Sequence, residues 1–197
     1  VLADGKVRCA YSIACAPRVD GSLELHVRAM PHSDNYVLLS QHLNIGTLLE
    51  ITLPFGRVHL PAGVTSAGPL LLLAGSTGFS QAKAFIEQWL QQGAAKPLLV
   101  YWGGRTRQDL YLNDWMKALA DQHTNLRYVP VVSDDNEWTG RKGFVHKAVL
   151  EDIQDFTGYT VFGCGSPPMV YAAYDDFTAA GMKPEQLLSD VFAYAPR

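Results

Sequence analysis

The sequence has few cysteines, little excess charge and no long hydrophobic run. Its three cysteines, Cys9, Cys15 and Cys164, form no C-x-x-C pair, and its six histidines show no metal-ligand spacing, so no disulfide framework or metal site is expected. The net charge is only −3 without a dense Lys/Arg stripe, which argues against a nucleic-acid partner. No apolar run approaches the roughly 20 residues that cross a bilayer, and no signal-peptide pattern is present. We expect a cytoplasmic globular protein.

The apolar pattern changes near residue 61, which predicts two domains. In residues 1–61, short apolar runs bounded by turn residues indicate a β-rich domain. Its expected elements are strands at 7–14, 23–28 and 48–53, a turn at 17–22 and a helix at 36–43. Glu24 and Arg28 alternate with apolar neighbours, which predicts a solvated strand face. The breaker-rich residues 62–68 predict a linker.

Residues 69–197 alternate between strand and helix patterns, which predicts an α/β domain with a parallel, doubly wound sheet of about five strands. The expected strands are 69–74, 97–102, 126–132 and 159–162, and the expected helices are 79–92, 108–122, 142–154 and 167–180. Ligands of such sheets bind beyond the carboxyl ends of the strands. Glycine-containing turns fall at these ends, at residues 75–78 (GSTG), 103–105 (GGR) and 163–168 (GCGSPP). Their gathering at one edge predicts a nucleotide site.

The turn at residues 75–78 joins a buried strand to a helix start. Such a start offers unpaired backbone N–H groups and the positive end of the helix dipole, which bind anions such as a pyrophosphate. Gly75 and Gly78 permit the turn and let a ligand approach the backbone closely. The turn alone is not the G-x-G-x-x-G fingerprint, and a plain strand-to-helix connection has the same pattern. The two other glycine turns favour the nucleotide site.

In order along the chain, these turns resemble the motifs of the ferredoxin–NADP reductase superfamily, most closely those of bacterial NAD(P)H–flavin reductases and oxygenase reductase components. Residues 72–80 (LLAGSTGFS) resemble the pyrophosphate turn, with Ser76 where a second glycine is usual. Residues 101–105 (YWGGR) resemble the second nucleotide turn. Residues 163–169 (GCGSPPM) resemble the Cys-Gly motif beside the nicotinamide, and residues 190–194 (DVFAY) resemble the aromatic tail.

The resemblance implies which residues of the second domain bind the pyridine nucleotide and cover the flavin. The implied cofactor-binding residues are Gly75, Ser76, Thr77, Gly78, Arg105, Gly163, Gly165, Phe192 and Tyr194. Cys164 would place its thiol at the hydride-transfer point, or serve only as a small buried residue. Arg105 would contact the ribose or a 2′-phosphate, which slightly favours NADPH over NADH; a solvated arginine is the alternative. Phe192 and Tyr194 would otherwise pack the core of a last strand.

Tyr11 and Ser12 resemble the end of the family's flavin motif, Arg-x-Tyr-Ser/Thr. The resemblance implies that the Tyr11 ring packs on the isoalloxazine of FAD or FMN and that the Ser12 hydroxyl reaches flavin N5. Cys9 stands where the family has arginine. Arg8 is the remaining candidate for the flavin phosphate, although alternation along a strand turns it to the opposite face unless a bulge restores it. Loss of this contact would weaken flavin retention.

The family's barrel has strands ahead of its flavin motif, whereas this sequence opens at Val1 without a methionine. We therefore expect residues 1–61 to form a partial antiparallel β-barrel flavin domain of a truncated chain, and residues 69–197 to form the NAD(P)-binding domain.

The expected function is that of a flavin-dependent oxidoreductase that passes a hydride from NADPH or NADH to FAD or FMN, with Ser12 and Cys164 as catalytic residues. Electrons would pass to a flavin, an iron–sulfur protein or an oxygenase. Two alternatives stay open. One is a flavin reductase that uses free flavin as its substrate, and the other is a non-catalytic module that binds pyridine nucleotides. The cysteine at position 9 fits both.

Overall fold

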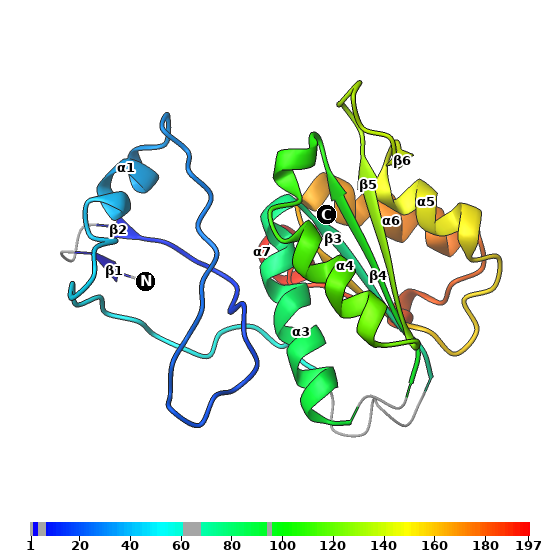
Figure 1. Cartoon of the computed structure of the whole chain (residues 1–197), viewed down its shortest axis with the longest axis horizontal. Helices are drawn as coiled ribbons and strands as arrows, with labels where there is room; N and C mark the ends of the chain where they lie inside the picture. Colours follow the sequence, from blue (N-terminus) through cyan, green and yellow to red (C-terminus); the bar gives the residue numbers. More distant parts are fainter. Residues whose placement is uncertain (1, 4–6, 61–67, 94–95) are drawn as a thin grey trace.

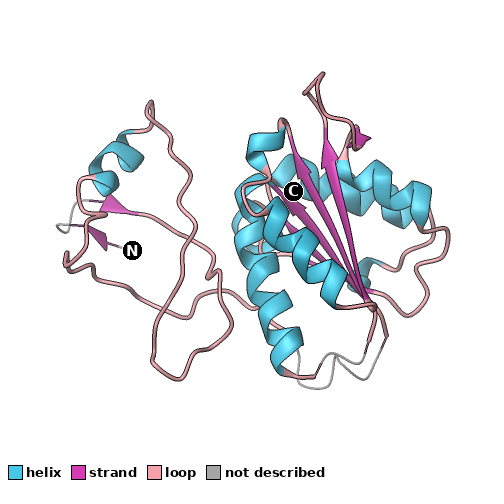
Figure 2. Cartoon of the chain, in the orientation of Figure 1, coloured by secondary structure: helices cyan, strands magenta, loops and turns pink. Residues whose placement is uncertain are grey.

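The computed structural model describes residues 2–3, 7–60, 68–93 and 96–197. Figures 1 and 2 show two parts of different character. We call the described residues of 2–60 the N-terminal part and those of 68–197 the sheet unit. The sheet unit consists of strands flanked by helices, whereas the N-terminal part is mostly loop (Figure 2).

The sheet unit contains a parallel sheet with six strands, in the order β6-β5-β4-β3-β7-β8. The strands are β3 (Leu70–Gly75), β4 (Leu98–Gly104), β5 (Leu126–Val132), β6 (Arg141–Lys142), β7 (Thr160–Cys164) and β8 (Leu187–Leu188). The chain moves outward from β3 to β6 and then returns to place β7 on the other side of β3. The strand order therefore reverses between β3 and β7, where doubly wound sheets bind ligands.

Helices cover both faces of this sheet (Figure 1). The helices are α3 (Phe79–Gln91), α4 (Asn113–Gln122), α5 (Val145–Asp152), α6 (Pro167–Ala179) and the short α7 (Val191–Tyr194). Successive residues of β3 point to opposite faces: Leu70 and Leu72 pack in one core with α3 and α4, and Leu71 and Leu73 pack in the other with α5 and α6. A strand buried on both faces explains the unbroken run of leucines.

The expected parallel sheet is confirmed, with differences at the ends of its elements. The helix expected from residue 108 begins at Asn113, because a 3₁₀ turn at Arg107–Asp109 closes with a capping box between Thr106 and Asp109. The helix expected from residue 142 begins at Val145, because Arg141 and Lys142 form β6. The short strands β6 and β8 and the helix α7 were not expected. Phe192 and Tyr194 therefore lie in a helix and not in a last strand.

The N-terminal part forms little of the expected β-structure. Its regular strands are β1 (Leu2–Ala3) and β2 (Val7–Arg8), and Ile13 and Leu25 form one isolated antiparallel bridge. The continuous strands expected at 7–14, 23–28 and 48–53 are absent from the described residues, and these residues form no antiparallel barrel. A strand exists only where a neighbouring strand completes its hydrogen-bond ladder. The described residues of this part supply few such neighbours.

The expected short helix is present in this part as α1 (Asp34–Ser40), with Ser33 as its N-cap. Of the expected linker at 62–68, residues 62–67 lie outside the described residues. Among the residues that the structure describes, no helix is long and apolar enough to span a membrane.

Candidate functional site

A cavity of about 540 Å³ opens where the N-terminal part meets the carboxyl ends of β3 and β7. Its wall comes from residues 9–12 on one side and from the turns at 75–78 and 163–166 on the other. In the sheet, Ala74 pairs with Cys164 and Gly75 pairs with Gly103. The register of the strands thus brings the three glycine turns to one edge, as the sequence predicted.

The turn before α3 and the first residues of α3 line the cavity. The chain leaves β3 through the 3₁₀ turn Ser76–Gly78 and enters α3 directly, and no side chain caps either helix start at Gly75 or Gly78. The Phe79 N–H is already bonded to the Ser76 and Thr77 carbonyls, so the uncapped N–H groups that can meet the oxygens of a bound anion lie ahead of Phe79. A pyridine-nucleotide pyrophosphate fits this arrangement.

The glycines of these turns are required by contacts within the protein. A Cβ at Gly78 would lie 2.2 Å from the carbonyl oxygen of Cys164, and a Cβ at Gly75 would lie 2.5 Å from Sδ of Met169. The space that the sequence assigned to close ligand approach is therefore already filled by β7 and α6. The close contact holds the pyrophosphate turn against the Cys-Gly turn.

Ser76 adopts a left-handed backbone conformation, with φ +48°, which explains why a glycine is usual there. A non-glycine residue in this region stores strain and persists only where its surroundings hold it. Two hydrogen bonds do so: Trp102 Nε1 donates to the Ser76 carbonyl at 3.0 Å, and Arg28 Nη1 donates to Ser76 Oγ at 2.8 Å.

Cys164 is a buried, neutral thiol at the back of the cavity. Its side chain is 3% exposed, and burial, followed by the nearby charge of Asp190, raises the pKa of the thiol well above its usual range. The Asp190 carboxylate also lines the cavity and accepts a hydrogen bond from Gln81 Nε2 at 2.9 Å. From the sequence, Asp190 was known only as the first residue of the aromatic tail, and its position beside Cys164 was not predicted.

Tyr11 and Ser12 face this cavity from the N-terminal part. Tyr11 is partly buried and Ser12 is exposed, and burial together with Cys9 raises the pKa of the Tyr11 phenol. The cavity thus brings together the two expected catalytic residues, Ser12 and Cys164. An aromatic ring and a hydroxyl opposite a buried thiol fit one planar heteroaromatic ring system.

Most of the other expected site residues line the same cavity: Gly75, Ser76, Thr77, Gly78, Gly163, Gly165 and Tyr194. Three do not. Arg8 is exposed on β2, outside the lining residues. Arg105 is 80% exposed at the end of β4. Phe192 is not among the lining residues and packs against Tyr171 and Tyr174. The binding roles of these three residues stay predictions.

Glu24 and Arg28 do not form a solvated strand face. Arg28 Nη1 reaches Ser76, and its Nη2 pairs with Asp109 Oδ1 at 3.1 Å. Glu24 pairs with Lys83 of α3. The alternation of polar and apolar residues showed which side chains share a face, but it could not show that this face meets the sheet unit. Arg28 lines the cavity and is a site residue that the sequence did not reveal.

The described residues contain no cluster of three or more His, Cys, Asp or Glu side chains that could hold a metal ion.

Comparisons with known proteins agree with this geometry. The family model of the oxidoreductase NAD-binding domain matches residues 72–175. The chain is 38% identical to the CDP-6-deoxy-L-threo-D-glycero-4-hexulose-3-dehydrase reductase of Yersinia pestis, over 94% of this chain and 55% of that protein. It is 32% identical to the NAD(P)H-flavin reductase of Aliivibrio fischeri, over 98% of this chain and 84% of that protein.

A solved structure has the same fold. The cytochrome P450 reductase GcoB of Amycolatopsis superposes with a TM-score of 0.76 at 30% identity, over 91% of this chain and 55% of that one. The chain spans about half the length of several curated relatives that it matches.

Proposed function

Because the chain belongs to the ferredoxin–NADP reductase superfamily, we propose that it works as a flavin-dependent oxidoreductase that takes a hydride from NADPH or NADH. One observation carries this proposal: Tyr11 and Ser12 share a cavity with Cys164 and with the turn at 75–78, although they come from different parts of the chain. When bound, FAD or FMN accepts a hydride from the reduced nicotinamide and passes the electrons on. The protein supplies binding, orientation and protection from water.

The described residues have distinct tasks in this proposal. The uncapped start of α3 holds the pyrophosphate, with Arg28 adding a cation beside Ser76. The Ser12 hydroxyl offers a hydrogen bond to the ring system. Cys164 presents a neutral thiol, so that it contacts the ring without placing a second negative charge beside Asp190. The buried residues of β3 and β7 exclude water from this side of the cavity.

We further propose that residues 1–61 supply the flavin-binding part of an antiparallel barrel, that residues 62–68 link it to the rest, and that residues 69–197 bind the nucleotide. Relatives bear the names of a phenol 2-monooxygenase reductase component and of a dehydrase reductase. By analogy, the electron acceptor of this chain is a flavin, an iron–sulfur protein or an oxygenase.

A second candidate function has its own support. Arg8 lies outside the cavity, and Cys9 occupies the lining position next to it. This segment therefore brings no guanidinium to a flavin phosphate. A protein that uses free flavin as its substrate would need no such clamp, because weak phosphate binding then favours release.

The absorbance spectrum of the purified full-length protein separates these functions. A yellow protein that NADH or NADPH bleaches supports the bound-flavin oxidoreductase. A colourless protein that oxidises the nucleotide only after flavin is added supports the second function. Absence of turnover with and without added flavin would contradict both and leave a nucleotide-binding module.

The Ser12→Ala variant tests the site itself. We expect the rate of flavin reduction to fall by on the order of tenfold to a hundredfold at saturating nucleotide, because the hydroxyl orients the reacting ring. Ser22→Ala, in an exposed turn of the same part, is the matched control and should leave the rate unchanged. Equal rates in both variants would exclude a catalytic role for Ser12.

A further inference from the structure

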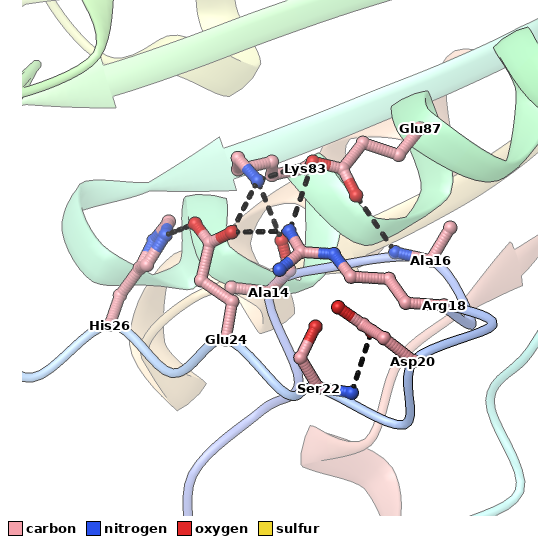
Figure 3. A network of polar contacts seen from close by, with 9 residues as sticks. All are labelled: Ala14, Ala16, Arg18, Asp20, Ser22, Glu24, His26, Lys83 and Glu87. Carbon is pink, nitrogen blue, oxygen red and sulfur yellow. Dashed lines mark hydrogen bonds and ion pairs between the residues drawn. The ribbon is translucent and has the colours of Figure 1, made fainter.

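A buried lysine lies where the N-terminal part meets the sheet unit. Lys83 stands near the start of α3 and is 7% exposed. Its ammonium group binds three oxygen atoms: the Ala14 carbonyl at 3.1 Å, Glu24 Oε2 at 3.0 Å and Glu87 Oε1 (Figure 3). A buried charge is tolerated only when it is paired and hydrogen-bonded in this way. Two of the three partners of Lys83 therefore belong to the N-terminal part.

The same carboxylates bind further groups of that part. Glu87 Oε2 accepts a hydrogen bond from the Ala16 N–H at 3.0 Å, and Glu24 Oε2 accepts one from Arg18 Nη2 at 2.7 Å. The Ala14 N–H donates to the Glu24 carbonyl at 2.8 Å. This bond joins the two ends of the loop that runs from Ala14 to Glu24. We call Ala14, Ala16, Arg18, Glu24, Lys83 and Glu87 the docking network. Figure 3 shows how it ties a single loop to one side of α3.

The two segments in this contact, the loop and α3, each adjoin residues that line the cavity. The loop begins at Ala14, shortly after Tyr11 and Ser12, and α3 begins directly after the turn at 75–78. Lys83 itself lies outside the cavity lining. A displacement of the loop along α3 would therefore move Ser12 relative to Cys164, while the start of α3 stays in place and Arg28 keeps its own contacts with Ser76 and Asp109 of the sheet unit.

We propose that Lys83 is a positioning residue: through the docking network it sets the separation between Ser12 on one side of the cavity and Cys164 on the other. The expected effect on the rate of flavin reduction rests on the proposed oxidoreductase function. The docking contact itself does not depend on that function. Positioning matters because a displacement of about 1 Å at a reacting centre can slow a reaction by about a hundredfold.

The charge balance explains why the lysine is needed. The network contains two cations, Lys83 and Arg18, and two carboxylates, Glu24 and Glu87. Without the lysine, Arg18 would be the one cation shared by the two carboxylates, 2.7 Å from Glu24 but 4.0 Å from Glu87, and of these two carboxylates His26 would hydrogen-bond Glu24 only. Removal of one partner from a partly buried ion pair leaves the other partner uncompensated. We therefore expect the loop to leave α3.

Lys83→Met in the full-length protein tests the proposal with three measurements. Amide hydrogen exchange at residues 14–16 should accelerate by about tenfold, because the Ala16 N–H loses its anchored acceptor. The dissociation constant for NADH should stay within about twofold, and flavin reduction at saturating NADH should slow by about tenfold or more. Lys83→Arg, which keeps the cation, should restore part of the rate. A general loss of stability in α3 would instead weaken nucleotide binding as well.

Lys147→Met is the matched control. It removes an ion pair of 2.7 Å with Asp176, within the sheet unit and away from the N-terminal part. It should alter neither the exchange at residues 14–16 nor the reduction rate. Glu24→Gln, a milder change in the network itself, should give intermediate effects on both.

Two results would overturn the proposal. One is unchanged exchange at residues 14–16 in Lys83→Met, which would show that the lysine does not hold the loop. The other is accelerated exchange with an unchanged reduction rate, which would show that docking does not position Ser12. If the protein reduces no flavin at all, the exchange result in the nucleotide-free protein still decides whether Lys83 holds the loop.

Discussion

At the scale of single residues, the charges around the turn after β4 bear on the choice between NADH and NADPH. Arg107 holds Asp135 with two hydrogen bonds, at 2.8 and 2.9 Å, and also binds Glu137 at 2.8 Å. Arg105 pairs with Asp134 at 3.4 Å. Hydrogen bonds from Arg107 hold the pKa of Asp135 well below its usual range, so this carboxylate stays ionised. Three carboxylates thus face two guanidinium groups, and a 2′-phosphate would meet excess negative charge.

We therefore expect the protein to prefer NADH, although Arg105 alone favoured NADPH in the sequence. In Asp134→Asn, which frees Arg105, kcat/KM for NADPH should rise by about fivefold and kcat/KM for NADH should change little, because exposed ion pairs contribute up to about 1 kcal/mol. Asp175→Asn, which frees the exposed Arg197 elsewhere, is the control. Steady-state kinetics with both nucleotides checks this. A wild-type preference for NADPH would contradict it.

At the scale of elements, the contact between the start of α3 and the end of β7 makes unequal demands on two glycines. At Gly78 the added Cβ would meet the backbone carbonyl of Cys164, which moves only if the whole strand moves. At Gly75 it would meet the sulfur of Met169, a flexible side chain that can turn aside. Neither glycine has a positive φ, so steric contact decides both cases.

Gly78→Ala should lower the free energy of unfolding by about 1–3 kcal/mol, as overpacking does in well-packed interiors, and should weaken NADH binding by moving the start of α3. Gly75→Ala should cost clearly less in both respects. Urea denaturation and nucleotide titration of the two variants provide the test. A Gly75→Ala variant that is the less stable of the two would show that Met169 cannot move.

The elements of the sheet were predictable because their signals are local. The leucines of β3 indicate a strand buried on both faces, and a glycine turn follows directly in the sequence. The strands of the N-terminal part were predicted from alternation alone, which is silent about whether a partner strand is present to complete the ladder. The 3₁₀ turn before α4 depends on a capping box that Thr106 and Asp109 form across few residues, and it could have been found.

The candidate site was predictable only in part, for the same reason. The order of the motifs predicted that Ser12, Cys164 and the turn at 75–78 would lie around one site. The hydrogen bond from Arg28 to Ser76 spans 48 residues, and the one from Gln81 to Asp190 spans 109. No local pattern marks such pairs, because each residue is by itself an ordinary polar side chain.

At the scale of the whole molecule, polar contacts decide how the N-terminal part sits on the sheet unit. That part leaves large apolar side chains in solvent, among them Ile45, Leu48 and Phe55, at 109%, 96% and 82% exposure. Few of its apolar side chains reach the sheet unit: Leu60 joins the apolar core there, and Val58 packs against it. The docking network, together with Arg28 and the contact of His26 with the Tyr111 hydroxyl at 2.6 Å, holds this part in place. Contacts made by charges depend on pH.

Glu24 should make this contact acid-sensitive. Burial by itself raises its pKa, but hydrogen bonds from His26, Lys83 and Arg18 outweigh burial and lower the pKa to about 2, from an ordinary value of 4.5. The ionised form is thus favoured in the docked state. A carboxylate with a lowered pKa contributes stability that is complete above the ordinary value and is lost as the pH falls through the lowered one. The docked state should therefore weaken between about pH 4.5 and pH 2.

Amide exchange at residues 14–16 across this pH range, corrected for the intrinsic pH dependence of exchange, measures the loss of docking. Protection in the wild-type protein should fall toward pH 2, whereas Glu24→Gln, which cannot ionise, should show weak protection with a much flatter dependence on pH. Far-ultraviolet circular dichroism at each pH separates loss of docking from unfolding of the sheet unit, whose helices do not depend on Glu24. If both proteins lose protection at the same pH and with the same slope, another group, with Glu87 foremost because it binds the Ala16 N–H, controls the contact in place of Glu24.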